Sequence, residues 1–125
     1  MTPTEIVNEF IARLCRFDVD GACELVTEDV EYDNVPMGKN HGPQGIKDLL
    51  GPMVSGLDEV DWVIHREAAT GDVVMNERTD RFRSGENWIE LPVTGVFELR
   101  DGKIALWRDY FDLETFNQQM AAALG

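Results

Sequence analysis

The sequence predicts an α+β fold, in which helices pack on one face of a curved and mostly antiparallel sheet. Two observations lead to it: apolar residues recur at helical spacing early in the chain, and long runs with strand character follow one another across residues 60–111. Helices followed by a strand meander are typical of α+β layouts, whereas α/β folds alternate the two elements. A curved sheet covered by helices can enclose a hollow, so we expect a cone with a deep apolar pocket.

The N-terminus has the signals of a capped helix. Thr2 is a candidate N-cap, Pro3 suits the first helical position, and Glu5 stands where a capping box requires it. Apolar residues then recur on one helical face, namely Ile6, Val7, Phe10, Ile11, Leu14 and Cys15. A shorter helix is predicted after residues 18–21, with an apolar side formed by Ala22, Leu25 and Val26.

The middle of the chain predicts a loop and a further helix. Pro36 and the glycines at 38 and 42 predict a loop over residues 36–42. The next helix begins at Pro43, a residue that favours the first turn, and runs to about Ser55.

The remaining segments have the character of strands joined by turns. They cover residues 30–35, 60–69, 73–83, 87–100 and 103–111. Pro92 predicts an edge position or a bulge in its strand, because proline cannot donate to a sheet ladder. After the last strand, Asp112 is expected to cap a closing helix that passes through Phe116 and Met120.

Length and composition limit the class of protein. The chain has 125 residues, 43% of them apolar and 28% charged, which predicts a single domain over residues 1–125 without a linker or a repeat. No apolar run approaches the roughly 20 residues that a membrane span needs, and the N-terminus does not have the pattern of a signal peptide. We expect a cytoplasmic protein.

The charge balance argues against two classes of partner. Acidic residues number 24 and basic residues 11, so the formal net charge is −13. Such a field repels phosphate backbones and anionic lipid, and we expect neither nucleic acid nor a membrane as a partner. Cys15 and Cys23 form no CxxC pair and have no second cluster to complete a zinc site, so we expect buried thiols and no metal.

Polar residues share strand faces with large apolar ones. Because strand residues two apart point the same way, Asn76, Arg78 and Asp80 lie on one face between Val74 and Phe82. In the same way, Asp109 shares a face with Trp107 and Phe111, and Tyr32 shares one with Asn34.

Two interpretations of these faces remain open. If they point into the cone, the fork of one arginine can serve two aspartates and offset the cost of burying the three charges. If they point outward, Arg78 and Asp80 form a surface pair of small energetic worth. The opposite parity, with Glu77 and Arg81, is polar as well, so periodicity alone does not choose between them.

At these residues the sequence resembles the limonene-1,2-epoxide hydrolase family, within the NTF2-like, SnoaL-like superfamily. The segment Glu31–Pro36 resembles the family's Tyr-x-Asn segment, and Glu77–Asp80 resembles its Glu-Arg-x-Asp strand. Residues 95–97 and 102–104, followed by Trp107–Asp112, resemble its C-terminal hairpin. The resemblance extends over almost the whole chain, and it implies an NTF2-like cone with a mixed, mostly antiparallel sheet.

The resemblance also implies a reaction and residue roles. The expected activity is hydrolysis of an apolar, cyclic or terpene-like epoxide with water, in one step and without a cofactor, to a vicinal diol. Asp109 would be the general base, Asp80 the acid that protonates the epoxide oxygen, and Arg78 the bridge between them. Tyr32 and Asn34 would position the attacking water. The family further implies a homodimer.

Opening an epoxide with water requires both an acid and a base. An epoxide oxygen leaves poorly as an alkoxide and needs a proton, while water is a weak nucleophile and needs a base. Two carboxyl groups around one cation can share a single proton and so supply both functions. The apolar residues expected to line the substrate pocket are Leu57, Trp62, Leu91, Val93, Phe111 and Phe116.

Two alternatives of other classes use the same fold. A ketosteroid-isomerase-like or polyketide-cyclase-like enzyme would need a tyrosine from the first helix, and residues 1–31 contain none. Superfamily dehydratases use histidines, and we expect His41 and His65 at the surface. A non-catalytic ligand-binding module is the other alternative, since a fold does not determine a function.

Overall fold

A computed structural model describes residues 1–124 of the chain. The first helix, α1, covers Pro3–Cys15 and has the expected capping box. The Thr2 amide donates to Glu5 Oε1 at 2.8 Å, and the Glu5 amide donates to the Thr2 hydroxyl at 3.1 Å. The predicted apolar face of α1 is buried from Ile6 to Leu14. Capping thus begins the helix where its buried face begins.

The second helix is shorter than expected. Helix α2 covers Val19–Cys23, and strand β1 already begins at Val26 and runs to Asn34. Val26 was predicted on the apolar side of the helix, but it pairs with Ile104 in the sheet. The Ile104 amide donates to the Leu25 carbonyl at 2.9 Å. Pairing with a strand far along the chain therefore overrides the local helical spacing.

The predicted loop over residues 36–42 contains a strand, so that prediction was wrong. Strand β2 covers Gly38–His41 and pairs antiparallel with β1, with Asn34 opposite Gly38. Its residues are exposed or half-buried, and they carry no apolar alternation from which a strand could be predicted. Helix α3, Gly42–Ser55, follows directly and continues past Pro52.

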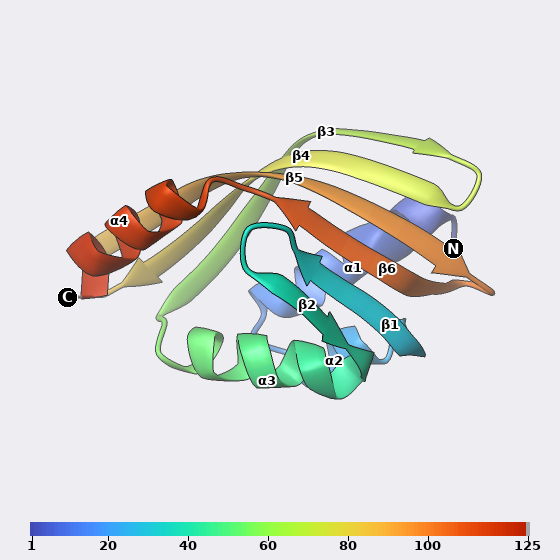
Figure 1. Ribbon diagram of the computed structural model, residues 1–125, viewed down its shortest axis with the longest axis horizontal. Helices are drawn as coiled ribbons and strands as arrows, with labels where there is room; N and C mark the ends of the chain where they lie inside the picture. Colours follow the sequence, from blue (N-terminus) through green and yellow to red (C-terminus); the bar gives the residue numbers. More distant parts are fainter. Residues whose placement is uncertain (125) are drawn as a thin grey trace.

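The sheet has six strands in the order β2-β1-β6-β5-β4-β3. Strands β3 (Glu59–Thr70), β4 (Val73–Ser84), β5 (Asn87–Arg100) and β6 (Lys103–Tyr110) form an antiparallel meander, and β1 joins β6 in parallel. Figure 1 shows helices α1, α2 and α3 on the same side of this meander. The mixed, mostly antiparallel sheet is therefore confirmed, and β2 and β3 leave it open at its two edges.

Strand β5 lies inside the sheet, but one of its sides is unpaired at Pro92, so the predicted edge position is confirmed at this residue. Pro92 pairs with Thr79 of β4, whereas pairing with β6 begins only at Thr94. At Pro92 the strand therefore has one neighbour, and the missing N–H removes no ladder hydrogen bond toward β6.

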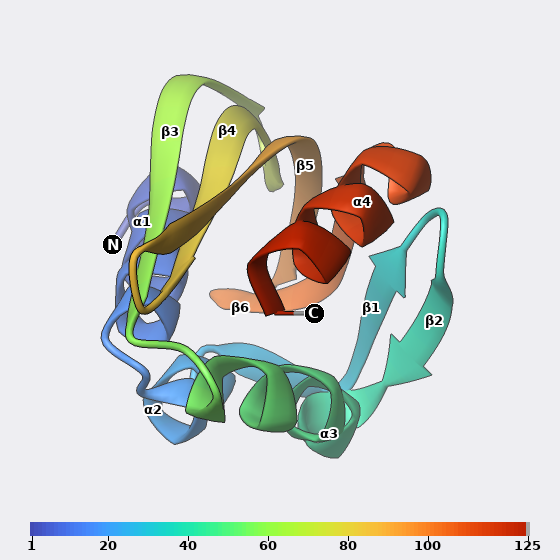
Figure 2. The ribbon, with the colours of Figure 1, turned by 90° about the vertical axis from the view of Figure 1, so that its left-hand side faces the viewer.

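The sheet curves around the interior, and α4 (Leu113–Leu124) lies across its open end (Figure 2). Asp112 caps α4 as expected, because its carboxylate accepts from the Thr115 amide at 3.0 Å. Among the helices within residues 1–124, none has the length and apolar character needed to cross a membrane.

Candidate active site

The structure decides which strand face points inward. In β4, Asn76, Arg78 and Asp80 are 2%, 1% and 4% exposed, while Glu77 between them is exposed. Asp109 in β6 and Tyr32 and Asn34 in β1 are buried too. The interpretation of Arg78 and Asp80 as a surface ion pair is therefore wrong, and these polar side chains belong to the interior.

Arg78 bridges the two buried carboxylates. Its Nε and Nη2 donate to Asp80 at 2.9 and 3.1 Å, and Nη2 also donates to Asp109 Oδ2 at 2.9 Å. The remaining fork nitrogen, Nη1, donates to Asn76 Oδ1 at 2.9 Å. Every nitrogen of the guanidinium thus has an acceptor, which a buried cation requires.

Gly95 makes this bridge possible. It pairs with Asn76 on one side and with Asp109 on the other, so it lies in the gap that the arginine must cross from β4 to β6. A β-carbon at this position would overlap Arg78 Nη1 and would lie 2.9 Å from both Asn76 Oδ1 and Asp109 Oδ1. The guanidinium therefore occupies the space that any other residue would fill, a close approach for which glycine is suited.

Asp109 has a second donor besides Arg78. The indole Nε1 of Trp107 donates to Asp109 Oδ1 at 2.9 Å, and the Trp107 side chain is fully buried. The parallel pairing of β1 and β6 places Tyr32 beside Trp107 and Asn34 beside Asp109. The tyrosine and indole rings stack at 4.0 Å with an interplanar angle of 8°.

The environment shifts the pKa values of this cluster. Burial raises the pKa of Asp80 to about 6, although the charge and hydrogen bonds of Arg78 act in the opposite direction. Burial opposes the charged form of Arg78, but the facing Asp109 and Asp80 outweigh it, so the pKa of Arg78 is raised. Burial and the nearby Asp109 also raise the pKa of Tyr32, which stays a neutral hydroxyl. Asp80 is thus a carboxyl group whose pKa is raised toward neutral pH.

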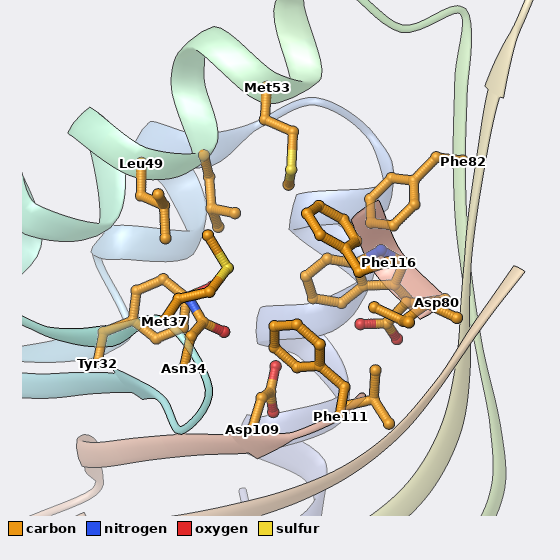
Figure 3. A pocket seen from close by; sticks show the side chains of 14 residues that line it. Tyr32, Asn34, Met37, Leu49, Met53, Asp80, Phe82, Asp109, Phe111 and Phe116 are labelled. Carbon is orange, nitrogen blue, oxygen red and sulfur yellow. The ribbon is translucent and has the colours of Figure 1, made fainter. Parts of the chain in front are cut away.

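Four of these polar residues line one cavity that is partly open to solvent. Figure 3 shows the carboxylates of Asp80 and Asp109 directed into it, with Tyr32 and Asn34 on the side of β1. Arg78 is bonded to both carboxylates but is not among the residues that line this cavity, and it is almost without exposure. The cavity can thus present an acid, a carboxylate and neutral polar groups to one bound molecule.

The rest of the wall is apolar. Of the residues that the sequence analysis proposed for it, Trp62, Leu91, Val93, Phe111 and Phe116 line the cavity. Leu57 was expected there too, but it lies in a neighbouring hollow beside Pro52 and Met120, because it follows the end of α3. The lining residues that were not foreseen are Met37, Leu49, Leu50, Met53 and Phe82. The helical spacing of Leu49, Leu50 and Met53 signals a buried face, but not what that face borders.

Other ionisable candidates lie away from the cavity. His41 and His65 are exposed, and His65 contacts the Thr79 hydroxyl on the outer side of the sheet at 2.8 Å. Cys15 and Cys23 are free thiols whose pKa values are raised by burial. Within the part of the chain that the structure describes, no three His, Cys, Asp or Glu residues gather as a metal site would require.

Comparison with known proteins identifies the family. A family model for the limonene-1,2-epoxide hydrolase catalytic domain matches residues 1–122. This chain belongs to the limonene-1,2-epoxide hydrolase family. It is also 37% identical over 107 residues to the epoxide hydrolase EphG of Mycobacterium tuberculosis, an alignment that covers 86% of this chain and 71% of EphG.

Solved structures agree with this membership. The structure of an M. tuberculosis epoxide hydrolase of the limonene-epoxide-hydrolase-like type superposes with a TM-score of 0.82 at 33% identity, over 98% of this chain and 91% of that one. A SnoaL-like structure from Shewanella putrefaciens has a TM-score of 0.84 at 18% identity and covers 98% of each chain. The second likeness shows the fold alone, and the expected NTF2-like, SnoaL-like fold is confirmed.

Proposed function

We propose that this member of the family opens an apolar epoxide by adding water in one step, which gives a vicinal diol. The observation that carries the proposal is the pair of buried carboxylates, Asp80 and Asp109, joined by Arg78 at the wall of an apolar cavity. One cation between two acids leaves a neutral site when the acids share one proton.

The proposed reaction needs no further reagent. Asp109, as the carboxylate, takes a proton from water while the water oxygen forms a bond to one epoxide carbon. The C–O bond on that carbon breaks, and Asp80, as the carboxylic acid, gives its proton to the leaving oxygen. The products are the diol, a protonated Asp109 and an ionised Asp80, and the proton returns to Asp80 before the next turnover.

Tyr32 and Asn34 are proposed to orient the attacking water. Both are held on β1, next to Trp107 and Asp109 in the parallel ladder, so little freedom is lost when water binds. The phenol of Tyr32 keeps its proton because its pKa is raised by burial. It can therefore accept and donate hydrogen bonds without competing with Asp109 as a base.

The wall of the cavity supports an apolar substrate, such as a cyclic or terpene-like epoxide. Its aromatic contribution comes from Trp62, Phe82, Phe111 and Phe116. Such a surface gives shape selection and excludes water other than the reactant. We infer a homodimer and a cytoplasmic location from the family resemblance and the sequence, and analytical ultracentrifugation would test the first.

Isotope labelling tests the one-step route. In a single turnover in ¹⁸O-water with enzyme in excess, the label should appear in the diol and not in the protein. Label found in the carboxylate of Asp80 or Asp109 would require a covalent ester intermediate and would rule out direct attack by water.

Substitution tests the roles of the two acids. Asp80→Asn and Asp109→Asn should each lower kcat by about 10²–10⁴, because each removes one proton-transfer function. Asp61→Asn is the matched control. Asp61 is half-exposed, and its carboxylate accepts from the guanidinium of Arg81, on β4, at 2.7 Å. The Asp61→Asn substitution should leave kcat unchanged. Normal turnover by Asp80→Asn would overturn the proposed mechanism.

A further inference from the structure

We propose that Trp107 is a positioning residue that keeps Asp109 ionised, so that the proton shared by the two acids resides on Asp80. The proposal rests on the function proposed above, because it concerns how that same site assigns its acid and its base. It adds a residue that touches neither the epoxide nor the attacking water in the proposed reaction.

The distribution of hydrogen-bond donors carries the inference. Asp80 accepts two hydrogen bonds, from Nε and Nη2 of Arg78. Asp109 also accepts two, but only one comes from Arg78 and the other comes from the Trp107 indole. Donors directed at a carboxylate favour its charged form. The indole thus gives Asp109 as many donors as Asp80 has. Without it Asp80 would have two donors and Asp109 one, a distribution that favours the proton on Asp109.

The indole is held so that its donor cannot turn away. Tyr32 stacks on it at 4.0 Å, the Phe10 ring meets it edge-on at 5.0 Å, and Phe97 lies nearly parallel at 6.1 Å. The side chain has no exposed surface and carries a single polar atom. That atom is already bonded to Asp109 Oδ1 at 2.9 Å, so the donor is fixed before substrate binds.

The same residue links the proposed base to the proposed water-positioning group. Its ring face supports Tyr32, and its ring nitrogen bonds Asp109. Arg78 holds one oxygen of Asp109 and Trp107 holds the other, which fixes the rotation of the carboxylate. A change in the indole nitrogen should therefore affect proton placement, whereas a change elsewhere in the aromatic stack should affect packing.

The test removes the N–H and keeps the ring. In Trp107→Phe, kcat should fall by about 10- to 100-fold while KM for a neutral apolar epoxide stays within about twofold. Both limbs of the kcat/KM pH profile should move upward by about one pH unit, because the anionic pair loses a donor. A second variant, with 3-benzothienylalanine incorporated at position 107, keeps the bicyclic shape without the N–H and should behave alike.

Phe97→Leu is the matched control for packing. It disturbs the same stack without removing a hydrogen bond, so it should lower the unfolding free energy and leave both pH limbs in place. If the benzothienyl variant folds with unshifted pH limbs and a kcat equal to the parent's, the inference is wrong. Its failure is distinguishable from failure of the proposed function, because Asp80→Asn would still have a strongly lowered kcat in the first case and the parent's kcat in the second.

Discussion

At the scale of single residues, the site depends on how a buried cation is accommodated. Arg78 is 1% exposed, and removing its charge from water is costly unless all of its donors are bonded. Asp80, Asp109 and Asn76 supply the acceptors, and Gly95 supplies the space. A site built in this way tolerates little change in volume, which makes the glycine as restrictive as the charged residues.

Gly95→Ala should therefore disrupt the site. The added methyl group overlaps Arg78 Nη1, so the guanidinium must move away from Asp109. We expect kcat to fall about 100-fold or more and the unfolding free energy to fall by about 1–3 kcal/mol. Steady-state kinetics and urea denaturation measure the two effects.

Gly51→Ala is the control for the same chemical change. Gly51 lies in α3, and an added β-carbon meets no atom within 4 Å. This variant should keep its kcat and gain little or no stability, because Pro52 directly after it disfavours the helical conformation of a residue that carries a β-carbon. Equal activities of the two variants would refute the role assigned to Gly95.

The raised pKa of Asp80 predicts a pH dependence of stability. The pKa rises from 3.8 to about 6 in the folded state, so between these values the folded protein binds the proton more tightly than the unfolded chain. Asp80 therefore lowers the unfolding free energy as pH rises through this window, by up to about 3 kcal/mol. Below pH 4 the penalty is absent.

Comparison of the parent with Asp80→Asn isolates this contribution. The difference in unfolding free energy should move in favour of Asp80→Asn by up to about 3 kcal/mol between pH 4 and pH 7. Urea denaturation at each pH provides the measurement, and the two proteins share all other titrating groups. A difference that does not vary with pH would contradict the raised pKa.

At the scale of elements, hydrogen bonds to β5 hold α4 beside the cavity, and Gln119 makes two of them. The Gln119 amide donates to the Glu90 carbonyl at 2.9 Å and accepts from the Glu90 amide at 2.7 Å, so it pairs with β5 as a strand would. Three residues earlier, Phe116 lines the cavity and packs against Phe111 at 5.8 Å. The hydrogen bonds of Gln119 therefore help to hold Phe116 in the aromatic wall.

Gln119→Ala should loosen this wall. With both hydrogen bonds to β5 lost, we expect KM for a small apolar epoxide to rise about three- to tenfold with a smaller change in kcat. Gln118→Ala is the control on the same helix, because the Gln118 amide bonds only Glu114 one turn away and is exposed. Identical KM values for the two variants would show that Gln119 does not hold the wall.

At the scale of the whole molecule, the net charge and the apolar cavity both favour a neutral substrate over an anionic one. The net charge of −13 creates a field that repels anions, and the cavity wall is apolar apart from the acids and their neighbours. A neutral epoxide meets neither obstacle. Selection against anionic substrates should thus begin before they reach the cavity.

Salt dependence should reveal that long-range selection. Between about 10 mM and 500 mM NaCl, kcat/KM for an anionic epoxide should rise several-fold, while kcat/KM for its uncharged amide should stay constant. Parallel assays of the two substrates at each ionic strength provide the comparison. Equal salt responses would show that the net charge does not affect the approach of substrate.

The predicted and observed bounds of the helices and strands show which elements can be predicted from neighbouring residues alone. Capping and apolar spacing correctly predicted α1 and α4, because both depend on residues within one or two turns. Strand β2 and the early start of β1 were missed, because these segments are defined by pairing with distant residues and carry no apolar alternation of their own. Leu57 was misplaced for a related reason, since its apolar character does not say which cavity it borders.

By itself, the sequence determined which residues can carry acid and base chemistry, and which of them share a strand face. Residue type and alternation are local properties, so Arg78 and Asp80 could be assigned to one face without a structure. Only the tertiary structure decided that this face points inward, and that Asp109, 31 residues from Arg78, completes the bridge. The physical reason is that curvature of the sheet and the parallel pairing of β1 with β6 arise from the packing of the whole chain.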